Sequence, residues 1–305
     1  MKTITLILIL FLVSCKSTDI KFPLQLTMEN APEPPGTIII TNNIYFDKRE
    51  ITNLDYLEYV FWTAHKFGQN SDEYLSVLPD TNVWGKLNSG YSDLISNYLK
   101  HPIYHSYPVV GVSYDQAVNY TNWRSDRVME MLLVYYKIIP WNPEVPKDSI
   151  FTIEKYFEGK YYGINPDKHS LVYPHYSLPD SSIYNRITLF ADSLNTINYK
   201  YCDKKNCQDK SLIECVCLES KTDRSISKPY GPDPTKSTNC EFCKKQIISH
   251  LKGNVREMTN KKGQYFGLSF IDSCKSQSYV IKYDSLGANS YTGFRNTCEW
   301  RVWKK

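Results

Sequence analysis

The sequence predicts an α+β fold with much irregular loop. Two amphipathic helical patterns and several β-branched strands follow one another without the regular strand–helix–strand rhythm of a parallel sheet. The length of 305 residues is enough to bury a substantial core. The 25 tyrosines also favour irregular loops, because each ring combines an apolar body with a polar hydroxyl that can fix a loop in place.

The first predicted elements are a β-hairpin and a helix. "TIIITNNIYFDK", residues 37–48, contains two β-branched stretches on either side of an Asn-Asn turn. Thr52 or Asn53 is placed to cap the helix that follows. The residues expected on its apolar face are Leu54, Leu57, Val60 and Phe61.

A second helix is predicted after an extended stretch that ends at Val112, with Ser113 as its cap. The residues that fall on one face at helical spacing are Ala117, Tyr120 and Trp123. Residues 137–200 are rich in Pro and Tyr and are expected to be mostly irregular. Residues 264–303 are expected to alternate short strands with turns.

The N-terminal stretch has the form of a bacterial export signal. Its apolar run, Ile4 to Val13, is too short to span a bilayer as a stable helix. "LVSC", residues 12–15, matches a lipobox, in which the cysteine takes the lipid and becomes the mature N-terminus. We therefore expect residues 1–14 to be a lipoprotein signal peptide and Cys15 the lipidation site, with residues 15–36 as a polar, Pro-rich tether. An ordinary signal peptide with an incidental cysteine is the alternative.

Removing Cys15 from the nine cysteines leaves eight, an even number that favours disulfides in an exported chain. Most of them lie in a segment at about 200–245 that is poor in apolar residues, so covalent links are expected to hold its shape. "CEFC", residues 240–243, has the spacing of a zinc ligand pair, but no second such pair accompanies it. We expect Cys274 to pair with Cys298. The disulfide candidates are Cys202, Cys207, Cys215, Cys217, Cys240, Cys243, Cys274 and Cys298.

The charge of the chain argues against one class of partner. A net charge of +4 without a concentrated basic stripe gives no electrostatic support for nucleic-acid binding. The sequence contains no GxGxxG, P-loop, GxSxG or HExxH pattern. We therefore expect no nucleic-acid partner. Since these catalytic motifs are absent, none of them gives a basis for predicting an activity.

Four stretches, in this order, resemble motifs of the formylglycine-generating enzyme (sulfatase-modifying factor) family. They are "REITNLDYLEYV", "YPVVGVSYDQAVNYTNW", "GNVREMT" and "TGFR", and "YSLPDSSIYNRIT" is similar to a degraded fifth. The resemblance implies that residues 37–305 form the C-type-lectin-like α+β fold of that family, with the Cys-rich segment at about 200–245 as an insertion. "LPDTNVW", "NWRSDRVMEML" and "FTIEKYFEGKY" resemble the gliding-motility and type IX secretion lipoproteins of Bacteroidetes, the K and J members.

The resemblance implies a calcium site at the third motif. Its ligands would be the carbonyls of Gly253 and Val255 and the carboxylate of Glu257, since Ca²⁺ prefers hard oxygens that a Gly-containing turn can direct at one point. The alternative is a structural turn in which Glu257 pairs with Arg256 or Arg295.

The resemblance does not extend to the oxidase chemistry of the family. Those oxidases bind Cu(I) through two cysteines spaced by four residues, and only Cys274 follows the corresponding stretch "GLSFIDSC". We therefore expect no copper site and no catalytic residues. His101 and His105 form an HxxxH pattern with Pro102 between them, and we expect them in a loop.

These observations together predict a non-catalytic formylglycine-generating-enzyme-like lipoprotein. It would be a structural or interaction component of a bacterial envelope assembly, related to gliding motility or type IX secretion. Its expected partners are envelope proteins and, through the lipid anchor, the membrane. It would lie in the cell envelope, at the outer membrane on the periplasmic or surface face. The alternatives are an active formylglycine-generating oxidase with relocated cysteines and a lectin-like ligand-binding module.

Overall fold

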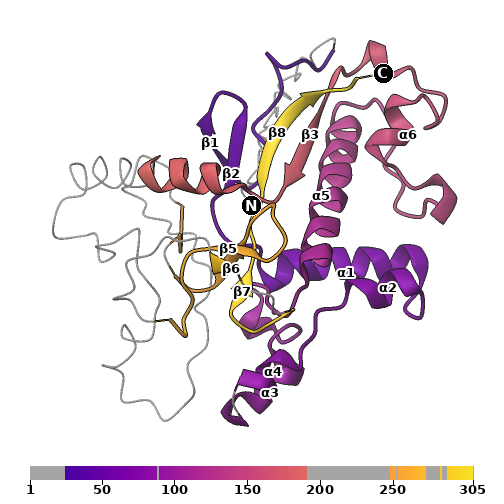
Figure 1. Cartoon of the computed structure of the whole chain (residues 1–305). Helices are drawn as coiled ribbons and strands as arrows, with labels where there is room; N and C mark the ends of the chain where they lie inside the picture. Colours follow the sequence, from indigo (N-terminus) through magenta and orange to yellow (C-terminus); the bar gives the residue numbers. More distant parts are fainter. Residues whose placement is uncertain are drawn as a thin grey trace, which may run out of the picture.

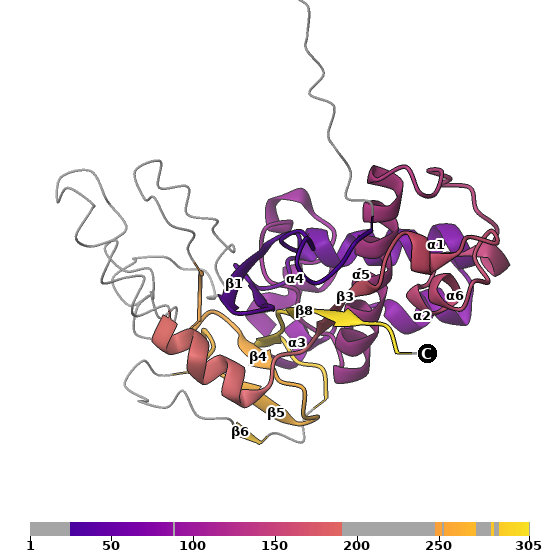
Figure 2. The same cartoon turned by 90° about the horizontal axis from the view of Figure 1, so that it is seen from above.

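The computed structural model describes residues 25–87, 89–190, 248–251, 253–272, 282–283 and 287–304. Its described part combines helices with two small sheets (Figures 1 and 2), which confirms the predicted α+β class. The cysteines from Cys202 to Cys243 and the insertion at about 200–245 lie outside the described residues, as do Cys15 and Cys274. Within the described residues, no helix is both long and apolar enough to cross a membrane.

The first sheet is antiparallel and has the strand order β1-β2-β8-β3. Its first two strands form the predicted hairpin, which turns through Asn43 with a φ of 65°. The long helix α5 runs beside β3 (Figure 1), and its residues Val128 and Leu132 pack on the sheet residues Tyr176 and Trp300. The strands are β1 (Thr37–Thr41), β2 (Ile44–Asp47), β3 (Val172–Ser177) and β8 (Thr297–Val302).

The second sheet brings the third and fourth family-like stretches together. Its order is β6-β5-β4-β7, and β4 pairs with β7 in parallel, Glu257 opposite Gly293. A Cβ at Gly293 would lie 2.8 Å from the carbonyl oxygen of Val109, so this close approach requires glycine. The strands are β4 (Arg256–Met258), β5 (Gln264–Phe266), β6 (Lys282–Tyr283) and β7 (Thr292–Gly293).

Helix α1 (Asn53–Phe67) begins as predicted but buries a different face. Thr52 caps it, and Asp55 completes a capping box that holds two N-terminal backbone amides. Leu54 and Phe61 are 47% and 69% exposed, so their predicted burial is wrong. Tyrosines take their place, since the buried residues of the helix are Asn53, Tyr56, Leu57, Tyr59, Val60 and Thr63.

Helix α5 (Tyr114–Tyr135) agrees with its sequence pattern. Ser113 caps it in a second capping box with Gln116, and Ala117 is buried as predicted. Tyr120 stacks on Tyr56 of α1 with ring centroids 5.6 Å apart. The two predicted helices therefore meet through aromatic rings, which are part of the central core.

The prediction that residues 137–200 are mostly irregular is only partly right for the described residues. Strand β3 alternates buried and half-buried residues along its whole length, although Pro174 obscures that pattern in the sequence. Residues 181–190 are helical, and the Asp180 carboxylate accepts the amide of Ile183 at 2.8 Å at the start of this helix. Figure 2 shows that helix beside the second sheet.

Short helices fill the connections between these elements. They expose most of their polar residues and place a few rings in the core, among them Trp84 at 1% exposure. They are α2 (Asp72–Val77), α3 (Val83–Leu87), α4 (Ser92–Asn97), α6 (Ile153–Phe157) and the 3-10 turns η1 (Ser89–Tyr91), η2 (Pro102–Tyr104), η3 (Lys147–Ser149) and η4 (Pro166–Lys168).

The predicted tether is docked on the domain from residue 25 onward. Leu26 is 2% exposed and pairs in parallel with Ser170, and its amide donates to the His169 carbonyl at 2.9 Å. The Trp300 indole donates to the carbonyl of Pro32 at 3.0 Å. A buried leucine and these backbone bonds make residues 25–36 part of the fold, so the predicted boundary at residue 36 is wrong.

Candidate functional site

The family-like stretches converge on five buried polar residues, which we call the Glu257 cluster. One member precedes α1, one lies on the helix over residues 181–190, one precedes β4, one is on β4 and one precedes β8. Each is at most 2% exposed. The cluster consists of Glu50, Tyr184, Asn254, Glu257 and Arg295.

Arg295 and Tyr184 engage both oxygens of Glu257. The Arg295 guanidinium donates from Nε to Oε1 and Oε2 at 2.8 Å each and from Nη2 to Oε1 at 2.5 Å. The Tyr184 hydroxyl donates to Oε2 at 2.8 Å, while its ring stacks on Phe266 of β5 with centroids 4.2 Å apart. Of the two arginine partners suggested by the sequence, the structure pairs Glu257 with Arg295. Arg256 instead binds Asp272 at 2.8 Å.

Glu50 adds a second carboxyl to the same buried space. Burial raises the pKa of this carboxyl to about 8, with Arg295 acting to lower it and Glu257 to raise it. Asn254 donates from Nδ2 to Glu50 Oε1 at 3.1 Å. At neutral pH Glu50 is therefore largely protonated, and one carboxylate faces one guanidinium. This charge balance suits a cluster without access to solvent.

The calcium ligands implied by the resemblance do not fit a cation in this geometry. Gly253 and Val255 are buried in the turn before β4, on either side of Asn254 with its φ of 71°. The carboxylate of Glu257, however, is turned onto a buried positive charge. A calcium ion there would have to displace Arg295 from both oxygens and leave its guanidinium unpaired in the core. Among the described residues there is no group of three or more His, Cys, Asp or Glu that could hold a metal ion.

Cys298 carries a free, buried thiol in the structure, and its predicted disulfide partner Cys274 lies outside the described residues. The side chain lies in the core between the first sheet and α5, with Val128, Leu132 and Tyr176 in the same cluster. Burial raises the pKa of the Cys298 thiol well above its usual range, which suppresses the reactive thiolate. The other disulfide candidates lie outside the described residues.

The two histidines of the HxxxH pattern flank the η2 turn as its two caps, in agreement with the predicted loop. His101 caps the turn by accepting the Ile103 amide on Nδ1 at 3.3 Å. The His105 ring contacts the Lys100 carbonyl at 3.3 Å through Nε2. Both rings therefore make local contacts to backbone.

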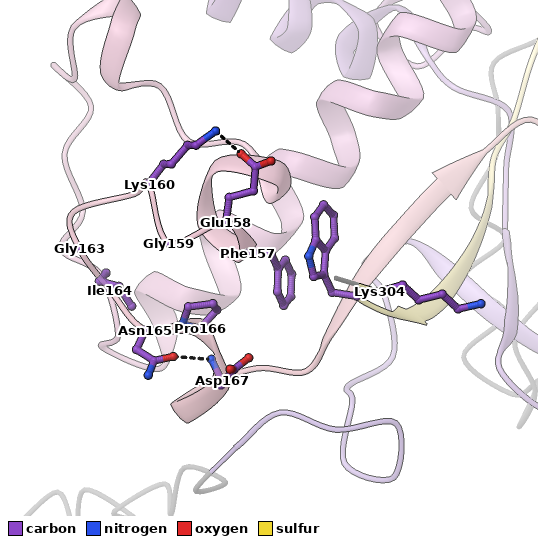
Figure 3. Close-up of a pocket in the computed structure, with 11 residues that line it drawn as sticks. Phe157, Glu158, Gly159, Lys160, Gly163, Ile164, Asn165, Pro166, Asp167 and Lys304 are labelled. Atoms are coloured by element: carbon purple, nitrogen blue, oxygen red, sulfur yellow. Dashed lines mark hydrogen bonds and ion pairs between the residues drawn. The ribbon is translucent and has the colours of Figure 1, made fainter.

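A surface pocket of about 760 Å³ is lined by the end of α6, the residues that follow it up to η4, and the residues after β8 (Figure 3). Phe157 of α6 and Trp303 after β8 stack in its wall, with ring centroids 5.1 Å apart and an interplanar angle of 9°. Lys160 and Glu158 form an ion pair of 2.8 Å at the rim. Sequence reasoning missed this pocket because its residues come from two segments far apart in the chain. It is lined by Phe157, Glu158, Gly159, Lys160, Gly163, Ile164, Asn165, Pro166, Asp167, Trp303 and Lys304.

Comparisons with known proteins leave the family of the chain open. No family model matches the sequence, and no curated protein matches it. Among solved structures, the chain is similar to the crystal structure of CarF, at 14% sequence identity over 86% of this chain and 87% of that chain, with a TM-score of 0.37. So distant a likeness carries no inference about fold family or function.

Proposed function

We propose that the protein is a non-catalytic, lipid-anchored relative of the formylglycine-generating enzymes. In this proposal it has their C-type-lectin-like fold and is a structural or interaction component of a bacterial envelope assembly, related to gliding motility or type IX secretion. The lipobox at Cys15 and the ordered series of family-like stretches support the proposal. Its partners would be envelope proteins.

The proposal that the protein is non-catalytic is supported mainly by the burial of charged residues from the family-like stretches. Glu50, Glu257 and Arg295 come from three of the family-like stretches and are between 0% and 2% exposed. Glu257 and Arg295 bond to each other, Glu50 accepts from Asn254, and Arg295 also donates to the backbone carbonyls of Asp47 and Ser249. The burial of these three residues supports a structural role for them, and fold by itself does not carry an activity.

A genetic experiment tests the assembly role. The gene is deleted in the source bacterium, and the strain is complemented with the wild-type gene or with Cys15→Ala. We expect deletion to reduce colony spreading or the release of secreted cargo, and wild type alone to restore it, because the variant lacks its membrane anchor. Normal spreading and secretion in the deletion strain would contradict the assembly role. Full rescue by an unanchored variant would contradict the role of the lipid.

A biochemical experiment tests the absence of oxidase activity. Purified protein is incubated with a CxPxR peptide, oxygen, a reductant and Cu(I), and the peptide is examined by mass spectrometry for formylglycine. We expect the peptide to remain unchanged. Formation of formylglycine that is lost in Cys274→Ser would establish the alternative of an active oxidase.

A further inference from the structure

The described chain begins at the wall of the surface pocket. The side-chain amide of Gln25 donates to the carbonyl of Asp167, which is a lining residue. Leu26 pairs in parallel with Ser170, three residues after Asp167. Pro166 and Asp167 of the η4 turn, which precedes Ser170 in the chain, line the pocket.

A local turn at Asn30 holds the backbone of Gln25 and Thr27 in place. The Asn30 side chain donates to the Gln25 carbonyl at 2.9 Å and accepts the Thr27 amide at 2.8 Å. The Leu26 carbonyl accepts the Leu171 amide at 2.9 Å. Backbone and side-chain bonds on both sides of Leu26 therefore hold Gln25 beside Asp167 at the pocket wall.

The pocket has an apolar wall and a charged rim. Phe157 and Pro166 are buried, and Trp303 stacks on Phe157. The rim carries both signs of charge, from Glu158, Asp167, Lys160 and Lys304. This combination suits a short extended segment with one or two large apolar side chains and a charged neighbour.

The residues immediately before Gln25 have this composition. "IKFPL", residues 20–24, contains Phe22 and Leu24 on alternate positions with Lys21 beside them. An extended residue advances about 3.3–3.6 Å, so Phe22 can lie only about 10 Å from Gln25. Pro23 favours an extended conformation of the residue before it, Phe22.

We propose that the pocket binds the protein's own segment of residues 20–24, with the Phe22 side chain against Phe157 and Trp303. One consequence rests on the proposed function, namely on lipidation of Cys15. With residues 20–24 held, the free tether shortens to residues 15–19, which reach about 17 Å when extended. The pocket end of the domain is then held close to the membrane, with limited freedom to turn.

Photocrosslinking of the full mature chain tests the docking itself, independently of lipidation and of the assembly role. Phe22 is replaced by benzoylphenylalanine, and intramolecular crosslinks are mapped by mass spectrometry after irradiation. We expect crosslinks to residues 157–167 or 303–304. The same photoreactive residue at Phe61, which is 69% exposed on α1, is the matched control and is expected to leave these peptides unlinked. Crosslinks from position 22 to a second copy, to lipid or only to other segments would overturn the proposal.

Amide hydrogen exchange, measured on protein without the photoreactive residue, gives a second test of the docking. Phe22→Ala is expected to speed amide exchange in residues 157–167 several-fold, whereas Phe61→Ala is expected to leave it unchanged. Neither side chain is in the described core, so both variants are expected to fold. Unchanged exchange in Phe22→Ala would overturn the proposal.

Discussion

Arg295 holds both carboxylate oxygens of Glu257 at a place where neither side chain reaches solvent. The guanidinium lies 2.5–2.8 Å from these oxygens, with 0% and 2% of the two side chains exposed. Arg295 also donates to the carbonyls of Asp47 at 3.3 Å and Ser249 at 2.9 Å. The pair thereby joins β4 to β2 and to the backbone at Ser249.

Loss of one partner of this pair should strongly destabilise the fold. Glu257→Gln leaves the Arg295 charge unpaired in the core, and we expect the free energy of unfolding to fall by about 3–5 kcal/mol. Urea denaturation measures the change. Glu299→Gln is the matched control, since Glu299 pairs with Arg301 at the surface, where 44% of the arginine side chain is exposed. We expect that change to cost less than about 1 kcal/mol. Equal losses in the two variants would contradict the structural role of the buried pair.

Calcium should leave the thermal stability of the protein unchanged. Glu257 is engaged by Arg295 and Tyr184, so no free carboxylate remains at the turn for a cation. A bound ion at about 100 times its dissociation constant would stabilise the fold by roughly 2.7 kcal/mol, which a melting curve detects easily. The measurement compares chelator-treated protein with and without millimolar Ca²⁺. A higher melting temperature that disappears in Glu257→Gln would establish the calcium site instead.

The local signals in the sequence were sufficient to predict several elements. The hairpin around Asn43 and the caps at Thr52 and Ser113 depend on residues only a few positions apart, and the structure confirms them. The apolar face of α1 was predicted only in part, because Tyr56 and Tyr59 are buried in the core while Leu54 and Phe61 are exposed. That outcome depends on the shape of α5 opposite, which periodicity within one helix does not contain.

For the Glu257 cluster, the sequence predicted only that Glu257 is either a calcium ligand or the partner of a nearby arginine. Arg295 and Tyr184 lie 38 and 73 positions from Glu257, and no spacing rule connects them. Tyr184 gave a weak signal, since it lies in the degraded fifth stretch. The docking of Leu26 was missed for a similar reason, because a single apolar residue in a polar segment looks like part of a linker.

Cys298 should be a free thiol in the purified protein. Denaturation without reductant is expected to make it react with an alkylating reagent, while in the native protein its burial and raised pKa should prevent reaction. Peptide mapping of native and denatured samples measures both. The outcome that contradicts this prediction is a disulfide-linked peptide containing Cys274 and Cys298 in the non-reduced digest.

The stability of the protein should fall with rising pH because of Glu50, and Glu50→Gln should remove this contribution. Burial raises the pKa of this carboxyl from its ordinary value of 4.5 to about 8 in the folded protein. Below pH 4.5 the carboxyl is protonated in both states, and above about 8 it is ionised in both, so neither range gives a slope. Between them the folded protein holds one proton more, and the free energy of unfolding falls by about 1.4 kcal/mol per pH unit.

Denaturation of wild type and Glu50→Gln at several pH values tests this linkage. Gln keeps the oxygen that accepts the Asn254 amide but cannot ionise. We therefore expect the variant to be nearly as stable as wild type near pH 5 and more stable by a few kcal/mol near pH 8.5. Glu29→Gln, at an exposed position, is the matched control and should keep the slope of wild type. If the difference between wild type and Glu50→Gln stays constant from pH 5 to pH 8.5, Glu50 is not a buried protonated acid, and the Glu257 cluster carries a second negative charge.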